Sequence, residues 1–501
     1  MSQVLVPPIR AEAAAGPVRH RRPGRNVVLL ALVALGYAAA QLALGMHRVF
    51  LGWDEILYVS QFSREVPPGF MDSPRAWGVP LLVAPVAAAT TSAEAIRIYM
   101  IVLVGLGVFL AFRSWLRLRN TVAVPAAALM LCTLWVSMFY GNAAMPNMIT
   151  ALCTVGAVAL FLRVPGGGAG RTRRVLVGLA AVFGAMSLVR PLDTVWICLP
   201  LIAAACLHRP WRRPATVAAI LTGSAVGWLP WTAEAHVRFG GLLPRLGDIA
   251  RWNGDGLHAQ AFRHLQSFSS GRLLCSSAHR TCGQVTAGAV LTWSALTVLV
   301  VTGLLASRRS VHLPALVLTV AVAVANALPY VFLSQLANPR FLLPTYALLV
   351  LVAAEGLRWI FRRRGMTGKL MVVVILVAFT GTQLAMASRV AVLIRDARAQ
   401  EIRRARAVIG LPVRRPCLVY GPGATQIAYV AHCRYWRHYV RGVPRRVPAR
   451  AIGDVFDRMR ARGLHVVVMT RGRRARDFPA GWRHVRLLPD QPWHAHLPPP
   501  P

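Results

Sequence analysis

Acidic residues are scarce in this chain of 501 residues: 17 aspartates and glutamates stand against 57 lysines and arginines, which gives a formal net charge of +40 at pH 7. Lysine is almost absent, so the bases are nearly all arginine. Such a charge often indicates nucleic-acid binding, but many of these arginines form short clusters between apolar runs. That distribution is typical of membrane topology, and we expect no nucleic-acid partner.

The chain also lacks the polar balance of a soluble protein. Hydrophobic residues make up 56% of the sequence, the mean hydropathy is +0.50, and apolar runs near twenty residues recur between Asn26 and Val390. No soluble core needs that many such runs. The sequence therefore predicts a mainly α, polytopic protein embedded in a lipid bilayer.

The first apolar run, at 26–46, lacks a clear small-x-small cleavage site. It follows a basic arm at 1–25 and is longer than the roughly 7 to 15 apolar residues of a secretory signal. We therefore interpret it as a retained membrane span and expect the arm, with the N-terminus, to be cytoplasmic.

Arginine clusters set the predicted topology, because basic residues concentrate in short cytoplasmic loops. Clusters on the same side must be separated by an even number of crossings, so only two of the three runs before Arg113 can cross. The run at 78–91 is short and contains Pro80 and Pro85, which favours a juxtamembrane helix on the outer face. The clusters are Arg113/Arg117/Arg119, Arg163/Arg171/Arg173/Arg174, Arg209/Arg212/Arg213, Arg308/Arg309 and Arg362/Arg363/Arg364/Lys369.

This rule predicts about eleven crossings within a membrane domain at 26–390. The outer segments are the loops 47–94 and 233–285 and the C-terminal region 391–501. The C-terminus is then extracytoplasmic, at a plasma membrane, and the Arg-rich, Ala-rich composition is typical of a high-GC bacterium. The predicted spans are 26–46, 95–112, 121–139, 146–162, 175–190, 191–207, 215–232, 286–306, 311–333, 341–360 and 369–390.

Cysteine is rare, and four of the eight cysteines fall in outer segments. Cys275 and Cys282 lie in the loop 233–285, and Cys417 and Cys433 lie in the C-terminal region. Disulfides persist in oxidising compartments, so we expect two disulfides, with free thiols as the alternative because sequence does not fix connectivity. The cysteines inside spans, expected to be packing residues, are Cys132, Cys153, Cys198 and Cys206.

The C-terminal region has the pattern of a small α/β domain of about a hundred residues. A proline run at 497–501 predicts a disordered tail. The predicted elements are strands at 416–420 and 465–470 and helices at 424–431 and 451–462.

In a chain so poor in acids, the adjacent pair Asp54 and Glu55 follows the first span, at the membrane boundary. A carboxylate beside a low-dielectric slab can have a raised pKa, which suits a general base that deprotonates a hydroxyl or an amine. The alternative is that Asp54 only caps a helix at the interface. Asp72 and Arg75 follow in the same outer loop.

Two arginines lie at the outer ends of spans, where the positive-inside rule disfavours them. Arg340 opens the span 341–360, and its planar guanidinium suits a phosphate held by two hydrogen bonds; the alternative is a snorkelling anchor. For Arg190 we favour an ion pair with Asp193 beside a proline break, although both are candidate substrate-binding residues.

Together these features resemble the GT-C superfamily of membrane glycosyltransferases, above all its protein-O-mannosyltransferase-like and aminoarabinose-transferase-like branch. The shared features are the acidic pair after the first span, the proline-containing juxtamembrane helix, Arg-Pro at the end of a span, and Arg-Phe-Leu-Leu-Pro at 340–344. The resemblance covers about 26–390. It implies that a sugar, of hexosyl or mannosyl type, passes from a polyprenyl-phosphate donor to a protein, glycan or lipid acceptor on the outer face.

The resemblance also implies site roles. Asp54 is the expected base, with Glu55 as its partner, and Arg340 is the expected phosphate clamp, assisted by Arg75. The acceptor then attacks the anomeric carbon in a single displacement that inverts it. The leaving phosphate needs no proton at neutral pH, so one base and one cationic clamp suffice.

One departure concerns the next outer loop, where many members of the superfamily carry a second acid. Residues 141–147 contain none, so Asp72 or Asp193 is the candidate replacement. We assign no metal site and no certain cofactor; a divalent cation stays open as an alternative, although no residue indicates one.

Two other function classes stay open. A transporter or flippase usually places ionisable residues near the middle of the bilayer, whereas the acids here gather at the outer boundary. A catalytically inactive scaffold for envelope assembly would explain the missing acid.

Overall fold

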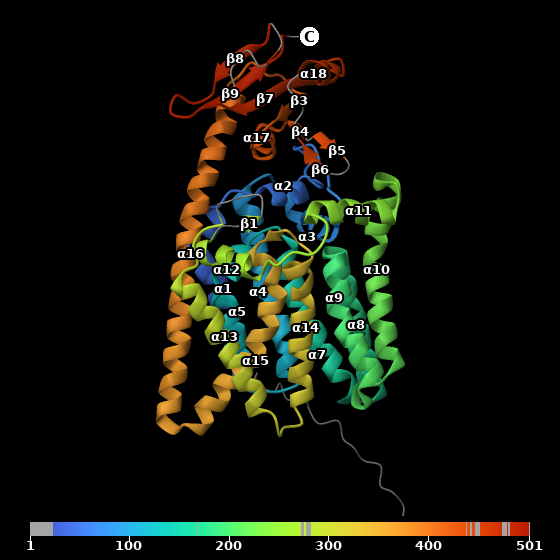
Figure 1. Cartoon of the computed structure of the whole chain (residues 1–501), viewed down its shortest axis with the longest axis vertical. Coiled ribbons are helices and arrows are strands. Elements are labelled where there is room, and N and C mark those ends of the chain that lie inside the picture. The colour runs from blue at the N-terminus through green and yellow to red at the C-terminus, as the bar shows by residue number, and fades with distance from the viewer. Residues whose placement is uncertain are drawn as a thin grey trace, which may run out of the picture.

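The computed structural model describes residues 24–166, 168–271, 275–276, 282–436, 438–440, 443–445, 451–472, 478 and 481–499. The chain forms a bundle of helices with a smaller sheet region at one end, called the outer end below (Figure 1). Residues 1–23 of the basic arm lie outside the described residues, so the side of the membrane on which the arm lies stays a prediction.

Eight helices in the described part of the chain are long and apolar enough to cross a membrane. They are α1 (Arg25–Ala43), α4 (Ala93–Leu116), α7 (Pro146–Arg163), α8 (Ala169–Val189), α13 (Ala287–Ala306), α14 (Leu313–Phe332), α15 (Leu343–Arg363) and α16 (Gly365–Ile409). Their outward side chains are apolar as well, such as Leu35 and Leu291, both about two-thirds exposed. Such surfaces suit contact with lipid, and the chain is a multi-pass membrane protein.

The predicted count of eleven crossings is not confirmed. Three expected spans are helices outside the group of eight: α5 (Ala123–Thr133), α9 (Pro191–Leu207) and α10 (Pro214–Phe239). The first two are short, and α10 is long but less apolar.

The span expected at 121–139 is also interrupted. Leu134 leaves the helical conformation, with φ −52° and ψ 128°, between α5 and α6 (Trp135–Tyr140). The backbone N–H of Trp135 donates instead to the side chain of Gln383 on α16, at 3.3 Å. A partner distant in sequence therefore replaces the local helical bond, which the apolar pattern could not reveal.

Neighbouring helices approach closely where glycine removes a side chain. A Cβ added to Gly227 on α10 would lie 2.2 Å from the backbone oxygen of Gly184 on α8. At Gly303 on α13 it would lie 2.3 Å from the backbone oxygen of Val352 on α15. A larger residue at either position would force the two helices apart.

Short elements cover the outer end of the bundle (Figure 1). They are α2 (Trp53–Val59), α3 (Gly78–Ala87), α11 (Leu242–Asn253), α12 (Ala261–Ser270), β1 (Cys275–Ser276), β2 (Leu336–Ala337) and the 3-10 turns η1 (Met46–Arg48) and η4 (Pro339–Leu342). The turns η2 (Val164–Gly166) and η3 (Arg209–Trp211) follow α7 and α9. A short helix is thus present where the juxtamembrane helix at 78–91 was expected.

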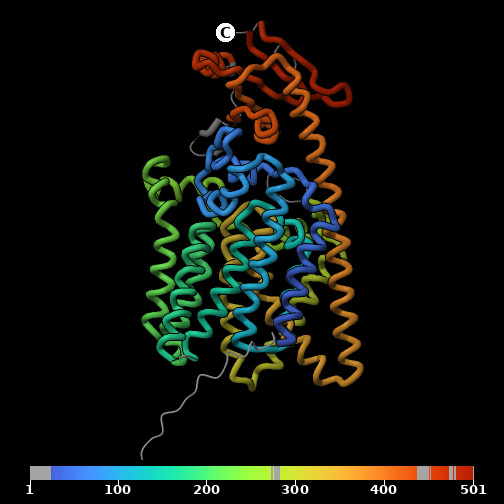
Figure 2. The backbone as a smooth tube through the Cα atoms, turned by 180° about the vertical axis from the view of Figure 1, so that it is seen from behind, coloured from blue at the N-terminus to red at the C-terminus, as the bar shows by residue number. Residues whose placement is uncertain are grey.

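The last span is longer than predicted. α16 runs without interruption from Gly365 to Ile409, 45 residues, or about 68 Å at 1.5 Å per residue, whereas the hydrocarbon core of a bilayer is about 30 Å thick. The expected domain boundary at 390/391 therefore falls inside a continuous helix, because no proline or glycine ends the helix there. Figure 2 shows α16 along the height of the bundle and up to the sheet.

The C-terminal region contains a five-stranded sheet in the order β4-β3-β7-β9-β8. Its elements are β3 (Cys417–Tyr420), α17 (Ala424–Ala431), β4 (Arg434–Trp436), α18 (Ile452–Arg460), β7 (His465–Arg471), β8 (Arg483–Arg486) and β9 (Trp493–Leu497), beside a separate pair of β5 (His438–Val440) and β6 (Val443–Arg445). β3 is parallel to β4 and β7, and β9 is antiparallel to β7 and β8.

The central strands of this sheet are buried on both faces. Val467 and Val468 on β7 belong to two different apolar clusters, one on each side, which is why the strand has a continuous apolar run. The predicted strands and helices correspond to β3, β7, α17 and α18. The expected disorder at 497–501 is wrong for Leu497, which is buried in β9 opposite Arg483, and residues 500–501 lie outside the described residues.

The sheet region contacts the outer loop 47–94, as Figure 2 shows from behind. The Tyr429 hydroxyl on α17 donates to the backbone oxygen of Thr91 at 3.1 Å, and its ring meets Phe50 edge-on at 6.2 Å between centroids. His432 lies 3.7 Å from Glu65. The sheet region therefore covers the segment that carries the acidic pair.

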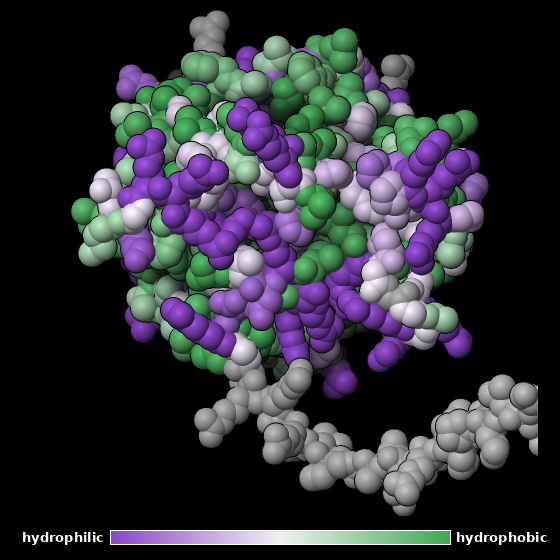
Figure 3. Space-filling model, turned by 90° about the horizontal axis from the view of Figure 1, so that it is seen from below, coloured by the Kyte–Doolittle hydropathy of each residue, from purple (hydrophilic) through white to green (hydrophobic). Residues whose placement is uncertain are grey.

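The opposite end of the bundle is formed by loops such as the tight turn between α15 and α16 (Figure 1). Hydrophilic side chains gather across this end, and hydrophobic side chains surround them (Figure 3). This distribution agrees with arginine-rich loops on one side of a membrane. That this side is cytoplasmic stays a prediction.

Candidate active site

A cavity of about 550 Å³ lies at the outer end of the bundle. Its charged lining residues are Asp54, Glu55, Arg75, Arg97, Arg190, Asp193, Arg340 and Arg398. They come from α2, from the loop that precedes α3, from the ends of several long helices, from η4 and from α16. Six of the seven site residues proposed from the sequence line this one cavity, and the seventh, Asp72, is buried behind Arg75.

Asp54 lies in the first turn of α2 and is held between two arginines. Its carboxylate accepts a hydrogen bond from Arg340 at 2.9 Å and a second from Arg75. Burial alone would raise the pKa of Asp54, but the charges of Arg340 and Arg75 outweigh burial and lower it to about 2. The expected raised pKa is therefore wrong for the protein without substrate.

Arg75 joins Asp54 to the buried Asp72, and its guanidinium lies 4.5 Å from the centre of the Trp53 ring. Burial would lower the pKa of Arg75, but the carboxylates of Asp72 and Asp54 raise it. Arg75 thus stays a cation inside the protein. Asp72 pairs with it and does not reach the cavity itself.

Glu55 is nearly enclosed, and both of its carboxylate oxygens are occupied. One accepts from the backbone N–H of Ala144 at 2.9 Å, and the other accepts from Arg97 at 2.7 Å and from the backbone N–H of Gly52 at 2.6 Å. Glu55, not Asp54, therefore caps α2, so the capping alternative for Asp54 is wrong. Through Ala144, Glu55 also fixes the outer turn 141–147, which lacks the second acid that many members of the GT-C superfamily carry.

Arg97 is a site residue that the sequence reasoning overlooked. It is almost fully buried in the first turns of α4 and also donates to the backbone oxygen of Val49 at 3.0 Å and to the side chain of Asn142 at 2.8 Å. An arginine within a predicted span was the available signal, because a buried charge in a membrane helix needs a partner.

Arg190 makes the predicted ion pair with Asp193, at 2.7 Å, where α8 ends and α9 begins. The pair has a third member that the sequence did not indicate, since the Tyr330 hydroxyl at the end of α14 hydrogen-bonds to both. The Tyr330 ring stacks on Phe341, with centroids 4.8 Å apart and planes at 17°. These residues form one wall of the cavity, part polar and part aromatic.

Arg340 is positioned by the turn η4. The side chain of Asn338 accepts from the backbone N–H of Arg340 at 3.2 Å and from the Tyr140 hydroxyl at 3.3 Å. The Arg340 guanidinium lies 5.6 Å from the centre of the Tyr140 ring. The aromatic rings on this side of Arg340 carry no negative charge, so the carboxylate that pairs with this guanidinium is that of Asp54.

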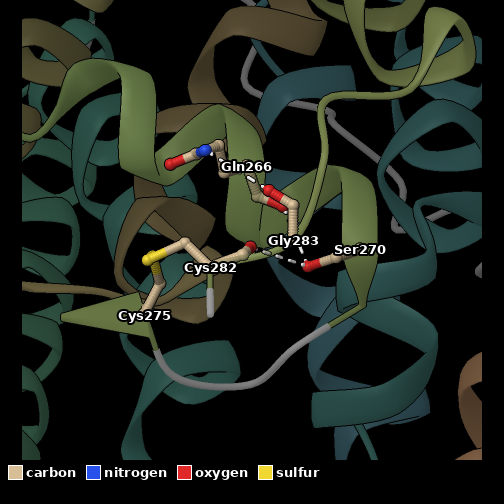
Figure 4. The surroundings of a disulfide bond; sticks show 5 residues. All are labelled: Gln266, Ser270, Cys275, Cys282 and Gly283. Atoms are coloured by element: carbon tan, nitrogen blue, oxygen red, sulfur yellow. Dashed lines mark hydrogen bonds between the residues drawn. A yellow bond between two sulfur atoms is a disulfide. The ribbon is translucent and has the colours of Figure 1, made fainter. Parts of the chain in front are cut away.

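Both predicted disulfides are present, Cys275–Cys282 and Cys417–Cys433. The first supports η4, because β1 pairs with β2 so that Cys275 lies opposite Ala337, three residues before Arg340. Figure 4 shows this disulfide together with Ser270 on α12, whose hydroxyl contacts the backbone oxygen of Cys282 at 3.4 Å. The outer loop 233–285 is thereby tied to the turn that carries Arg340.

Arg245 on α11 is a second overlooked arginine, and it is fully buried. It donates to the backbone oxygens of Ser73 and Arg75, each at 2.9 Å, and of Trp231 at 2.6 Å, and it pairs with Glu234 at 2.9 Å. Four acceptors around one guanidinium fix the loop that carries Arg75. No sequence pattern predicts this role of Arg245, because its acceptors are mostly backbone atoms.

Four residues of the loop 233–285 that could have faced an acceptor do not line the cavity: Asp248, Asp255, His258 and His264. Asp248 pairs with Arg251 at the surface. His264 is buried on α12, with a ring nitrogen 3.2 Å from the backbone oxygen of Tyr330, and burial lowers its pKa to about 4. No group of three His, Cys, Asp or Glu side chains in the described part of the chain could hold a metal ion.

No family model and no curated protein matches the sequence. Among solved structures, ArnT from Cupriavidus metallidurans bound to undecaprenyl phosphate superposes with a TM-score of 0.65 and 13% identity, over 94% of this chain and 97% of that one. The chain has the ArnT fold. The apo state of ArnT gives a TM-score of 0.62 over the same shares, again at 13% identity. The Archaeoglobus fulgidus oligosaccharyltransferase gives only 0.48, with 13% identity over 82% of this chain and 63% of that one.

ArnT, an aminoarabinose transferase, belongs to the GT-C superfamily. The fold that the sequence resemblance implied is therefore confirmed, including the small sheet region after the helical bundle. At 13% identity the likeness concerns the fold alone. The roles of individual residues have to come from the cavity.

Proposed function

We propose that this protein transfers a sugar from a polyprenyl-phosphate donor to an acceptor at the outer face of the membrane. The observation that carries the proposal is a carboxylate, Asp54, held between two arginines in a cavity at the outer end of an ArnT-like bundle. The ArnT structure with undecaprenyl phosphate supports a lipid phosphate as the ligand.

Arg340 and Arg75 form the phosphate site. The Nε atoms of both arginines are buried, so an incoming anion has to bind their Nη groups, which contact Asp54 in this structure. Hydrogen bonds between arginine and phosphate are charge-assisted and are often bidentate. The donor phosphate therefore competes with Asp54 for these cations.

That competition prepares the base. With both arginines on it, Asp54 has a pKa of about 2 and attracts protons weakly at neutral pH. When the donor phosphate takes over one of the arginines, burial dominates and the affinity of Asp54 for a proton rises. Donor binding thus comes first, and the base is released only when there is a sugar to transfer.

The reaction is a single displacement. The acceptor oxygen gives its proton to Asp54 and attacks the anomeric carbon, and the bond from that carbon to the phosphate oxygen breaks. The leaving polyprenyl phosphate keeps the bonding electron pair as negative charge, which Arg340 and Arg75 neutralise. The anomeric configuration inverts, and Asp54 returns its proton to water when the site opens.

The aromatic wall suits the sugar. Tyr330 and Phe341 stack on each other, and Trp196, Trp231 and Trp252 also line the cavity. Such faces pack against the apolar side of a sugar ring while Arg190 and Asp193 offer hydrogen bonds to its hydroxyls. We expect a hexosyl donor, with mannose as the first to try.

The test is release of undecaprenyl phosphate from a panel of undecaprenyl-phosphate sugars by the purified protein, with a crude envelope fraction as acceptor. We expect release by the wild type and a loss of about 10²- to 10⁴-fold in Asp54→Asn, because a general base is removed. Asp248→Asn, an acid in the outer loop that does not line the cavity, is the matched control.

A folded wild-type protein that binds undecaprenyl phosphate but releases none from any donor would favour an inactive scaffold. Turn 141–147, which holds no acid, is the observation behind that second candidate. Release at the wild-type rate in Asp54→Asn would instead remove Asp54 from the reaction.

A further inference from the structure

We propose that Arg398 forms a second anion site in the cavity, which binds a phosphate or carboxylate group of the acceptor. The proposal rests on the proposed transfer reaction and narrows its acceptor to an anionic one. Arg398 comes from the part of α16 that extends toward the sheet region, where the sequence reasoning expected only a domain boundary.

The guanidinium of Arg398 has one edge occupied and one edge open. Its Nη1 donates to Glu401, one helical turn further along α16, at 2.7 Å. Its Nη2 makes no hydrogen bond with any described residue and faces Gly52, where an added Cβ would lie 3.4 Å away. Gly52 also lines the cavity, so the open edge of the guanidinium lies against the cavity wall.

The other four arginines of the cavity are balanced differently. Arg75 and Arg340 share Asp54, and the remaining two pair with Glu55 and Asp193, all three of which are carboxylates of the cavity itself. The partner of Arg398, Glu401, does not line the cavity. An anion can therefore bind Arg398 without displacing a carboxylate that the reaction needs.

The location of Arg398 suits an acceptor. Gly52 precedes Asp54 by two residues, so an anion that binds Arg398 from the cavity lies beside the segment that carries the base. The surroundings also attract anions, because the C-terminal region 391–501 contains 22 arginines and only six acids. An acceptor that carries a phosphate or a carboxylate is thus drawn to this side of the cavity.

The experiment uses the full-length protein in nanodiscs with saturating undecaprenyl phosphate, which occupies the Arg340 site. Glucose 6-phosphate and glucose are the two probes, and their affinities are measured by ligand-observed NMR. We expect the phosphate form to bind at least about tenfold more tightly, because a charge-assisted contact is worth about 1.5 to 3 kcal/mol. Inorganic phosphate should compete, which separates recognition of the anion from recognition of the sugar.

Arg398→Gln should abolish the preference for the phosphate form. Arg395→Gln, on the same helix but outside the cavity lining, should keep it, and Glu401→Gln should strengthen it by removing the negative charge that competes with the anion for Arg398. Equal affinities for the two probes in the wild type, or an unchanged preference in Arg398→Gln, would overturn the proposal. A failure of the proposed function would be seen in another measurement: the affinity for undecaprenyl phosphate would then be the same in the wild type and in Arg340→Gln.

Discussion

The helical bundle and the C-terminal region 391–501 are both rich in arginine, but the arginines have different surroundings. In the bundle, Arg97 and Arg245 are almost completely buried, and each pairs with a carboxylate. In the C-terminal region, pairs such as Arg403 with Asp490 are more than half exposed and 3.9 Å apart. A buried cation needs a partner, whereas an exposed cation is solvated by water.

This contrast between buried and exposed arginines indicates how to interpret the few acids of an acid-poor chain. Eleven of the 17 acids precede residue 391, and most of those that the structure describes pair with an arginine, as Glu355 does with Arg119 and Arg358. In such a sequence an acid in the bundle indicates an arginine that lies next to it in the fold. The C-terminal region also contains such pairs, for example Arg398 with Glu401, but the positive-inside rule does not extend to this region because that rule applies to short loops.

Arg245→Met should have the largest effect on stability. The variant leaves the backbone oxygens of Ser73, Arg75 and Trp231 without their donor, so we expect a loss of about 3 to 5 kcal/mol in the free energy of unfolding. Arg403→Met, in the exposed pair with Asp490 of the C-terminal region, should cost less than about 1 kcal/mol. Thermal unfolding in detergent measures both, and similar losses would remove the contrast between the two regions.

Arg340→Gln should reduce transfer by about 10²- to 10³-fold, since it removes a donor that stabilises the leaving phosphate. The affinity for undecaprenyl phosphate should fall as well. Arg403→Gln, an exposed arginine of the C-terminal region, should leave both quantities unchanged. A variant of Arg340 that binds the lipid normally and transfers the sugar normally would contradict the phosphate clamp.

The buried His264 should make stability depend on pH. Its pKa is lowered to about 4 from 6.5, so the folded state prefers the neutral ring. The contribution of this pKa shift to the free energy of unfolding is fully present above pH 6.5 and is lost as the pH falls toward 4. The total loss is about 3 kcal/mol, at 1.36 kcal/mol per pKa unit. Unfolding measured from pH 7 to pH 4 tests this, and His264→Gln should show a weaker dependence.

Asp457→Asn should have the smallest effect. Asp457 is well exposed and pairs with Arg460 one turn away on α18, at 3.0 Å. We expect a change of less than about 0.5 kcal/mol that disappears at high salt. A loss as large as that of Arg245→Met would mean that surface pairs hold the C-terminal region together.

Periodicity and apolar runs predicted much of the fold. The helices of the bundle, the juxtamembrane helix and four elements of the C-terminal region lie close to their expected positions, because each follows from local pattern. The break at Leu134 and the length of α16 were missed. The break depends on a distant partner, Gln383, and α16 lacks a stop signal that a hydropathy window could detect.

The site shows the same division. Asp54 was proposed because acids are scarce and Arg340 because an arginine at the outer end of a span is unusual, and both line the cavity. The pKa of Asp54 was predicted in the wrong direction, because its pairing with Arg340 joins residues 286 apart in the sequence. Arg245 and Arg398 were missed for a related reason, since their importance depends on which backbone atoms or cavity walls the fold brings to them.

The continuous helix α16 contains both a membrane span and the segment that supports the sheet, so the two move together. Its lipid-facing half is held by the bilayer, and its other end carries the sheet region over the cavity. A change in bilayer thickness or in the tilt of this helix therefore alters the height of the sheet above Asp54. Under the proposed function, this height limits the size of the acceptor that can enter the cavity.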